Sequence, residues 1–394
     1  MRHWRKILKN GIGIAYIKKK QYLCSRKGYA IIFAIMRKIS IVLVGLFVGM
    51  MGMPLMAQQL PDPHFETWTD KFNNDAQLKD WHGSNVAQVG FKFTFLFAKP
   101  GRTGQCAYVA DRTIGAFGIK ETGPGYVSLG QPWQFMNGLS TKSATAGTYG
   151  GIAWKYRPDT MAVWVKRTGA NTDKEDFHLL FYSWQGTAKS GQYKNKVGGC
   201  TKVERINEES DIRIALDGNE CGVDQPAKQV CEGWYRARAK YNEWTLIKVP
   251  IFYMNDATPT MCNVIFSAGN YPAFRANDGL YDGNGLYIDD VELIYSSRID
   301  KLVIGGKEWK GFNPNSAAEQ VYKLPEGGKL TFEAYRGMGS LTNIQGKRVS
   351  FRGRRLNDKE MTIQPGEVNG NPWIITVKAE DGSSTHTYKI KVEN

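Results

Sequence analysis

The sequence predicts an all-β protein with two domains. Short runs of β-branched and aromatic residues alternate with clusters of Gly, Pro, Asn and Asp, which is the pattern of strands and turns. No long stretch keeps the 3.6-residue periodicity of an amphipathic helix. After an N-terminal leader, the chain is long for a single core and comfortable for two domains. We expect these domains over residues 58–297 and 298–394.

Residues 1–57 are expected to lie outside the fold. Met36-Arg37-Lys38 precedes an apolar run from Ile39 to Met53, and the small residue Ala57 follows. This is the pattern of a secretory signal peptide cut near Ala57, so we expect translation to start at Met36 and residues 1–35 to be an overcalled start. The run is shorter than the roughly 18–20 residues that span a membrane. The sequence therefore predicts export to the periplasm or cell surface, without an integral membrane anchor after cleavage.

The basic character of the chain resides in this leader. The full chain carries a net charge of +15, and its first 57 residues contain eleven Lys and Arg and no acid, so that 15 − 11 leaves +4. A nearly neutral mature chain carries no strong electrostatic footprint for nucleic acid. We expect no nucleic-acid partner.

The first domain contains seven clear strand patterns before its closing strand. Short alternating apolar segments, each bounded by turn residues, predict strands at Phe91–Ala98, Cys106–Ala110, Tyr126–Leu129, Thr160–Val165, Asp176–Trp184, Trp244–Val249 and Cys262–Ser267. Between Gln185 and Glu232 the pattern lapses, and we expect a long loop.

The closing strand of this domain, within 279–296, has a break in its alternation. Leu286 and Ile288 fall on even positions, whereas Val291, Leu293 and Tyr295 fall on odd ones. A continuous core face needs a one-residue slip, which a β-bulge at Asp289-Asp290 would supply. A strand buried on both faces with a solvated acidic pair is the alternative.

The two ends of this domain resemble a known family. The closing Tyr-Ile-Asp-Asp-Val at 287–291, and the opening Pro63-His64-Phe65-Glu66-Thr67-Trp68 followed by Trp81, are similar to the carbohydrate-metabolism domain known as PCMD, found in surface proteins of gut Gram-negative anaerobes. The resemblance implies a jelly-roll (galactose-binding-like) β-sandwich with a role in glycan handling.

The resemblance also implies a structural calcium ion. In related jelly rolls, an opening Glu and a closing Asp hold calcium where the first and last strands meet, because hard cations prefer carboxylate oxygens. The residues that match are Glu66, Asp289 and Asp290. A surface Glu beside a solvated acidic pair is the alternative.

The clearest strand pattern of the second domain lies at its C-terminal end. Ile375, Val377 and Ala379 alternate with polar residues, a Gly-containing turn follows, and Tyr388 to Val392 alternate again. This pattern predicts a β-hairpin with one buried face. It resembles the closing hairpin of immunoglobulin-like or cadherin-like bacterial modules. The Ser296-Ser297-Arg298 joint is expected to connect the domains with few contacts between them.

Five cysteines remain in the mature chain. We expect at least one disulfide among Cys200, Cys221 and Cys231, since export permits disulfides. Cys106 and Cys262 lie on apolar strands and are candidates for buried thiols.

Motifs of common enzyme classes are missing from the sequence. There is no phosphate-binding loop, dinucleotide fingerprint, zinc-protease motif or nucleophile elbow. Glycosidase chemistry needs only two carboxylates, which spacing does not exclude. The acidic runs at 173–176 and 208–211 are candidates, although charge runs are more often solvated.

Aromatic residues in or beside expected loops are the stronger functional signal. A flat ring buries the apolar C–H face of a sugar. We nominate four of them as ligand-binding residues: Trp133, Trp184, Trp234 and Tyr235. The alternative is that they cap the edges of the sandwich. Trp154 and Trp164 are expected in the core.

The favoured function is non-catalytic binding of a glycan or another cell-surface partner. The alternatives are a glycoside hydrolase or related glycan-processing enzyme, and a structural or adhesive role without sugar.

Overall fold

The computed structural model describes most of the chain after the leader. The described residues are 59–69, 78–88, 91–116, 118–137, 140–149, 151–185, 193–195, 203–205, 214–215, 228–269, 279–337, 340–342, 348–350 and 353–394. Every regular element within these ranges is a β-strand, which confirms the all-β prediction. No helix in this part of the chain is long and apolar enough to cross a membrane. The expected leader lies outside the described residues.

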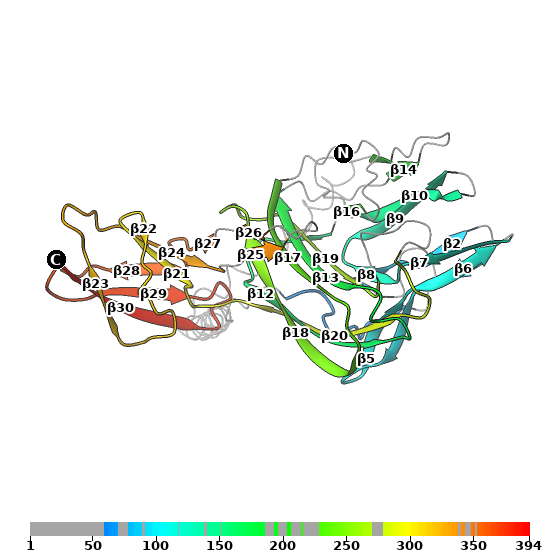
Figure 1. The fold of residues 1–394 in the computed structure, drawn as a ribbon, viewed down its shortest axis with the longest axis horizontal. Helices are drawn as coiled ribbons and strands as arrows, with labels where there is room; N and C mark the ends of the chain where they lie inside the picture. Colours follow the sequence, from blue (N-terminus) through cyan, green and yellow to red (C-terminus); the bar gives the residue numbers. More distant parts are fainter. Residues whose placement is uncertain are drawn as a thin grey trace, which may run out of the picture. The chain divides into compact units, whose positions relative to one another are not determined.

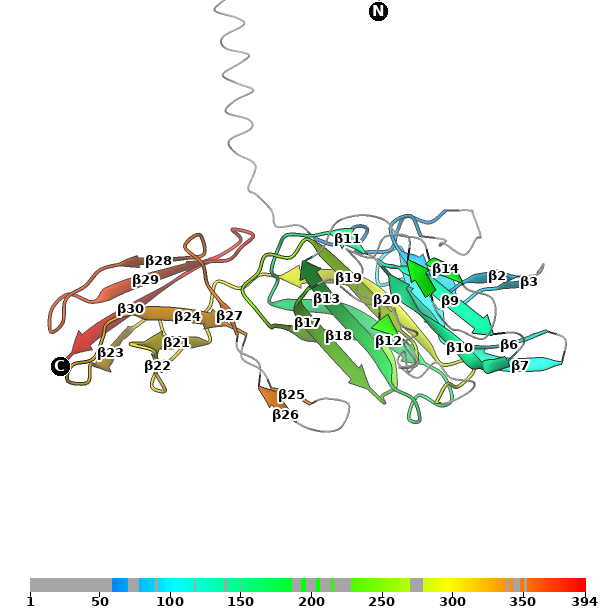
Figure 2. The same cartoon turned by 90° about the horizontal axis from the view of Figure 1, so that it is seen from above.

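The first domain is built on one large, curved sheet of eleven strands (Figures 1 and 2). Its strands pair antiparallel in this order: β1 (His82–Gly83), β8 (Tyr126–Ser128), β19 (Met261–Ser267), β13 (Phe177–Gln185), β17 (Lys228–Ala237), β18 (Tyr241–Tyr253), β12 (Thr160–Thr168), β20 (Gly285–Ile294), β5 (Gln105–Ala110) and β4 (Leu96–Pro100). The short β11 (Ile152–Ala153) pairs with β19 as well. This nearly closed sheet is the jelly-roll-like sandwich that the sequence predicts.

Smaller sheets accompany the large one. They are β9 (Gln131–Asn137) with β10 (Ser140–Tyr149) and β16 (Ile214–Ala215), then β2 (Val86–Gln88) with β3 (Phe91–Phe93), β6 (Arg112–Ala116) with β7 (Ile119–Gly123), and β14 (Tyr193–Asn195) with β15 (Val203–Arg205). Six of the seven expected strands occur as single strands, whereas the expected Phe91–Ala98 is divided between β3 and β4, which belong to different sheets. The loop expected up to Glu232 ends sooner, because β17 begins at Lys228.

The core of this domain lies inside the curved sheet. Alternate residues of each strand point inward, since side chains of a strand alternate between its faces. Ile288, Val163, Phe181 and Trp81 are fully buried in this core. Trp154 is nearly so. Burying one such aliphatic side chain contributes roughly 1.5–3 kcal/mol. Trp154 is a core residue, as expected.

The expected bulge in the closing strand is present. In the pairing of β12 with β20, Ala162 faces Glu292 and Trp164 faces Asp289, so two residues of β20 oppose Val163 alone. Asp290 takes a left-handed backbone conformation with φ of 47°. The slip lets Ile288 and Val291 both point into the core.

The second domain has its own core between two four-stranded sheets. One sheet contains β22 (Lys307–Glu308), β21 (Lys301–Ile304), β24 (Phe332–Arg336) and β27 (Arg354–Arg355), and the other contains β23 (Glu319–Lys323), β30 (Thr385–Glu393), β29 (Trp373–Lys378) and β28 (Met361–Gln364). β25 (Ser340–Thr342) pairs with β26 (Arg348–Ser350). Figure 2 shows β28, β29 and β30 in one layer and β21, β22 and β24 in the other. The predicted closing hairpin is β29–β30.

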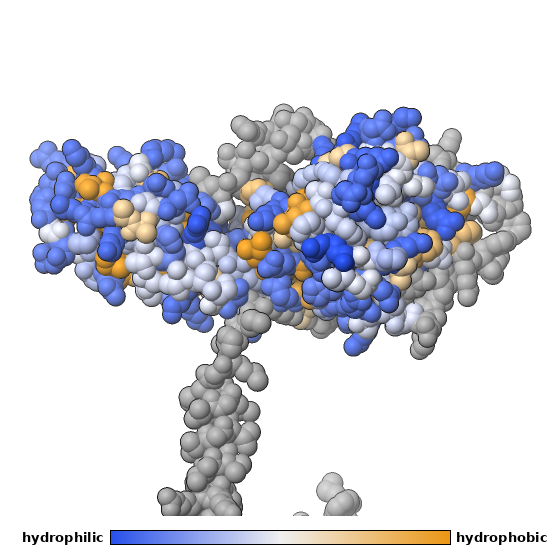
Figure 3. All heavy atoms as spheres, turned by 90° about the horizontal axis from the view of Figure 1, so that it is seen from below, coloured by the Kyte–Doolittle hydropathy of each residue, from blue (hydrophilic) through white to orange (hydrophobic). Residues whose placement is uncertain are grey.

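The described surface carries few large apolar side chains. Leu246, Met254, Val321 and Val368 are exposed. The face drawn in Figure 3 shows apolar residues as small patches among polar ones. Surface apolar residues that are scattered in this way need no partner.

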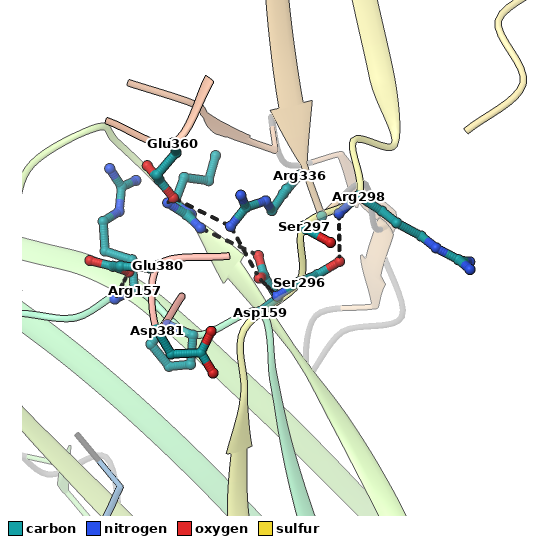
Figure 4. A network of polar contacts seen from close by, with 12 residues as sticks. Arg157, Asp159, Ser296, Ser297, Arg298, Arg336, Glu360, Glu380 and Asp381 are labelled. Atoms are coloured by element: carbon teal, nitrogen blue, oxygen red, sulfur yellow. Dashed lines mark hydrogen bonds and ion pairs between the residues drawn. The ribbon is translucent and has the colours of Figure 1, made fainter. Parts of the chain in front are cut away.

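A network of buried charges connects the two domains (Figure 4). Asp159 of the first domain lies 3.5 Å from Arg336 and 3.7 Å from Arg354 of the second. Both arginines also pair with Glu360, and the Glu380 carboxylate accepts a hydrogen bond from the backbone N–H of Arg157 at 2.7 Å.

This network overturns the expectation of few contacts across the joint. Arg157, Arg336 and Arg354 are nearly fully buried, and their three charges face the three carboxylates of Asp159, Glu360 and Glu380. Asp159 also accepts the backbone N–H of Ser296, within the joint itself, at 2.6 Å. Burial raises the pKa of Asp159, although Arg354 and Arg336 act in the opposite direction.

The cysteine predictions are resolved in part. Cys106 and Cys262 are buried free thiols, as expected. Cys231 is also a buried free thiol, on β17 and 2.8 Å from the Ser183 hydroxyl, so the predicted loop disulfide can join only Cys200 and Cys221. Burial raises the pKa of Cys231 to about 12, which keeps the thiol unreactive. Cys200 and Cys221 lie outside the described residues.

The domain contact predicts a large cost for removing Asp159. Asp159→Asn leaves Arg336 and Arg354 with less compensating charge in a buried site, and breaking a buried pair costs roughly 3–5 kcal/mol. Urea unfolding measures the difference. The control is Glu333→Gln, which breaks the exposed pair with Arg355 and is expected to cost less than about 1 kcal/mol. Equal effects of the two substitutions would contradict the account.

Candidate functional site

A row of half-buried aromatic rings crosses the outer face of the large sheet. We use the name aromatic row for four rings and the lysine that lies among them: Phe97, Tyr108, Tyr287, Lys166 and Trp244. They lie on β4, β5, β20, β12 and β18, five strands that pair side by side. Neighbouring strands lie about 4.8 Å apart, so the row spans roughly 19 Å.

The alternation of each strand places these side chains outward. Tyr287 stands between Leu286 and Ile288, which are both fully buried. Tyr108 likewise stands between Ala107 and Val109 of the core. The pairing register then aligns the row, because Tyr287 faces Lys166 on one side and Tyr108 on the other.

Gly285 gives Tyr108 room to lie across the sheet. A Cβ at Gly285 would come within 2.2 Å of the Tyr108 hydroxyl and 2.4 Å of its ring, so a larger residue there would displace the ring. The pairing places Gly285 on β20 beside β5. Glycine in a strand often marks such a close approach.

The rings contact one another along the row. The centroids of Tyr108 and Tyr287 are 4.4 Å apart, those of Phe97 and Tyr108 are 6.0 Å apart, and those of Trp244 and Tyr287 are 6.3 Å apart. These separations fall within the range of favourable aromatic pairs. Burial raises the pKa of both tyrosine hydroxyls, so they remain protonated donors at neutral pH.

Trp164 lies beside this row, on β12, and was expected in the core. It is half-buried instead, and the Arg102 guanidinium stacks on its ring at 3.9 Å from the centroid. Arg102 also pairs with the Asp290 carboxylate. Trp164 therefore connects the outer face to the acidic end of the closing strand.

Two of the residues nominated for calcium, Asp289 and Asp290, have ligand atoms close together, and the third residue of that group is His64 and not Glu66. Glu66 accepts the backbone N–H of Gln105 at 3.0 Å, and Asp289 accepts that of Arg102 at 2.7 Å. The loop between β4 and β5 is thus held against both carboxylates. Burial raises the pKa of Asp289, and the hydrogen bond from Arg102 lowers it.

Two members of this group have the oxygen donors that a hard cation takes, and the third, His64, offers a nitrogen. Ligand atoms of His64, Asp289 and Asp290 lie within 4.8 Å of one another, and the His64 Nδ1 is 2.6 Å from the Asp290 carboxylate. Carboxylate oxygens suit calcium, and each can accept more than one partner. Arg102 is the competitor, because its guanidinium already supplies positive charge to Asp290. The residues fit a cation that shares or replaces that charge.

Two of the four nominated aromatic residues are buried or pack against the core. Trp184 is fully buried in β13, so it presents no face to a ligand, and its nomination is wrong. Tyr235 packs against the core beside Phe177 and shares a 3.1 Å hydrogen bond with Tyr241. Both residues lie on strands and not in loops, which is why their composition-based nomination failed.

The other two nominees lie elsewhere on the sheets. Trp234 packs with Tyr126, Leu180 and Ile265 on the opposite side of the sheet from the core, and its indole N–H donates to His178 at 3.4 Å. It is half-buried, and its ligand role stays a prediction. Trp133 lies on β9, opposite Gly147 of β10.

One residue of the acidic runs considered for catalysis, Glu175, forms a buried pair with Asp111. Glu175 and Asp111 are both almost fully buried, and a Cβ at Gly269 would come within 2.2 Å of one carboxylate oxygen and 2.0 Å of the other. Burial and the nearby Glu175 raise the pKa of Asp111 well above its usual range. Asp173 is exposed, Asp176 pairs with Arg238, and residues 208–211 lie outside the described part.

The charge balance of this pair indicates a shared proton. The guanidinium of Arg167 is fully buried nearby and donates to the backbone carbonyls of Thr172 and Glu175. One proton between the two carboxyl groups leaves a single negative charge, which Arg167 balances. With neither carboxyl group accessible to a substrate, the pair has a structural role in this conformation.

Comparisons with known proteins add little to this geometry. No family model matches the chain, so the resemblance to PCMD stays a prediction, and no curated protein matches it either. A glycoside hydrolase candidate from Bacteroides thetaiotaomicron is 14% identical over 61% of this chain and 73% of its own, with a TM-score of 0.37. Another from Bacteroides vulgatus is 18% identical over 51% and 77%, with a TM-score of 0.34.

A carbohydrate-binding module is also among the similar structures. The family 11 module of a cellulase from Clostridium thermocellum is 10% identical over 56% of this chain and 91% of its own, with a TM-score of 0.23. All three TM-scores lie below 0.5, so these likenesses carry no argument about fold or activity.

The shared proton predicts a specific pH dependence. In the folded state the acid pair keeps one proton, whereas in the unfolded state this proton is released near the ordinary carboxyl pKa. The free energy of unfolding therefore falls as pH rises above about 4. In Asp111→Asn, an amide N–H replaces the proton. We expect the variant to gain stability relative to wild type between pH 5 and pH 8, measured by urea unfolding.

The control for this prediction is Asp282→Asn, which changes an exposed carboxylate that accepts the backbone N–H of Thr113. Its stability difference from wild type should stay constant over the same pH range. A constant difference for Asp111→Asn as well would show that no proton is shared.

Proposed function

We propose that the protein binds a glycan along the aromatic row without cleaving it. The observation that carries the proposal is the row itself: aromatic rings on four of five adjacent strands, half-buried and in mutual contact across the sheet. Ring faces bury the C–H faces of sugars, and the tyrosine hydroxyls supply hydrogen bonds. A rigid sheet holds these groups in place before the ligand arrives.

Export fits this proposal. The pattern from Met36 to Ala57 is that of a signal peptide, and polysaccharides are met outside the cytoplasm. We therefore place the protein in the periplasm or at the cell surface, with a glycan as its partner.

Removing a ring from the row is expected to weaken glycan binding about tenfold or more. Tyr287→Ala and Trp244→Ala each remove a stacking surface, and a tenfold change corresponds to about 1.4 kcal/mol. A glycan array identifies ligands, and affinity electrophoresis on the hits compares the variants. Assays for released reducing ends on the same glycans test for cleavage.

The matched control is Tyr335→Ala. This tyrosine lies on β24 of the second domain and also has a lysine over its ring, Lys301 at 5.4 Å. The Tyr335→Ala variant should bind the glycan as wild type does. If the Tyr287 and Trp244 variants also bind normally, the ligand does not use the row. Release of reducing ends would favour an enzyme instead.

We also propose that calcium binds at the acidic end and has a structural role. It would tie the opening segment, through Glu66, to the bulged Asp289-Asp290 pair. A ligand that binds only the folded state stabilises it by about 2.7 kcal/mol at a hundredfold excess over its dissociation constant. Thermal unfolding with calcium should therefore show a higher melting temperature than with chelator.

Variants separate calcium from the arginine that competes with it. Asp290→Asn and Glu66→Gln should reduce the calcium-induced shift in melting temperature, whereas Glu319→Gln, at an exposed site in the second domain, should leave it unchanged. Arg102→Gln removes the competing charge and should enlarge the shift. Equal melting temperatures of wild type with calcium and with chelator would mean that no calcium binds and that Arg102 alone balances the charge of Asp290.

A further inference from the structure

The aromatic row carries cations on its rings. The Lys166 ammonium lies 4.3 Å from the ring centroid of Tyr287 and 5.7 Å from that of Trp244. At the other end, the Arg112 guanidinium lies 5.7 Å from the centroid of Phe97. Both positions fall within the range of cation–π attraction, which holds these charges against the ring faces.

Neither cation is paired with an acid in the described part of the chain. The ion pairs found there include neither Lys166 nor Arg112. Among the described residues, Arg112 donates to the backbone carbonyl of Thr94, at 3.3 Å.

The acids near the row include Asp111, Asp282, Asp290 and Glu292. The Asp282 carboxylate accepts the backbone N–H of Thr113, next to Arg112, at 2.6 Å. Asp111 is buried against Glu175, and Asp290 is paired with Arg102. Glu292 faces Ala162, whose other cross-strand neighbour is the exposed Lys248. No member of the row is itself acidic.

We propose that the glycan bound by this row is an anionic polysaccharide. The inference rests on the proposed function and adds the class of ligand. A carboxylate or sulfate group on a sugar would pair with Lys166 while the sugar ring stacks on Tyr287 and Tyr108. The same contacts recur at the Phe97 end, where Arg112 takes the place of Lys166.

The position of Lys166 disfavours a neutral glycan. A neutral sugar that stacks on Tyr287 must move the ammonium from the ring and gives it no counter-charge in return. An anionic sugar replaces the cation–π contact with an ion pair, so the cation becomes part of the binding surface. Unpaired positive charge also raises the local concentration of an anionic chain and speeds its association.

The test compares charged and neutral forms of the same polymers. Affinity electrophoresis of the exported protein uses polygalacturonate against its methyl ester for carboxylates, and dextran sulfate against dextran for sulfates. We expect stronger binding to the charged member of at least one pair, weakening as salt is added. The pair that shows the difference identifies the anionic group.

Substitutions locate the charge that is used. Lys166→Gln should weaken binding to the anionic polymer roughly two- to fivefold, as removal of a half-exposed ion pair does, and Lys166→Arg should restore it. Lys389→Gln removes an exposed lysine on β30 of the second domain and should have no effect. Equal loss in both glutamine variants would overturn the assignment to Lys166, because it would reflect net charge alone.

The outcomes for class and function are distinct. Equal or stronger binding of the neutral polymers, still dependent on Tyr287, overturns the anionic class and leaves the proposed function standing. Absence of binding to every polysaccharide overturns both. A single-stranded oligonucleotide, which also combines stacking with negative charge, is the third probe, and stronger binding to it than to the anionic polymers would overturn the proposal.

Discussion

A one-residue slip in the closing strand organises the first domain. Without the bulge at Asp290, the residues after Ile288 that share its face would be Asp290, Glu292 and Ile294, and two carboxylates would enter the core. The slip turns Val291 and Leu293 inward instead. It leaves Tyr287 facing outward before the bulge and places the acidic pair against the loop between β4 and β5.

Buried charge in this protein is compensated locally. At the domain contact, three buried arginines meet three carboxylates, and beneath Gly269 an acid pair that shares a proton is balanced by Arg167. Such compensation is necessary, because an unpaired charge in a buried site costs several kcal/mol. The cations of the aromatic row are different: they are half-exposed and unpaired by acids, which is the condition of a surface that can still accept an anion.

The sequence was sufficient for the elements that depend on local patterns. Alternation predicted the strands, and the shift from Ile288 to Val291 predicted the bulge, because a one-residue slip brings both side chains to the same face of a strand of period two. The same local reasoning identified Cys106 and Cys262 as buried thiols.

The site and the domain contact required the pairing order of the strands. Tyr287 lies on a strand that is far along the chain from those of Phe97 and Tyr108, and the order β4-β5-β20-β12-β18 aligns them. Trp184 and Tyr235 were nominated because they lie in or beside expected loops, yet Trp184 is fully buried on β13 and Tyr235 packs against the core from β17. The contact of Asp159 with Arg336 likewise joins positions that no local pattern relates.

The most direct test of the central claim is to observe the row while a glycan binds. Indole N–H signals of the exported protein, labelled with ¹⁵N-tryptophan, can be followed by NMR during titration with the best polysaccharide ligand. The account predicts that the Trp244 signal shifts, with Trp164 beside it, while the buried Trp81 and Trp154 and the second-domain Trp309 stay constant. A shift of Trp234 or Trp309 with Trp244 unchanged would place the ligand elsewhere and contradict the account.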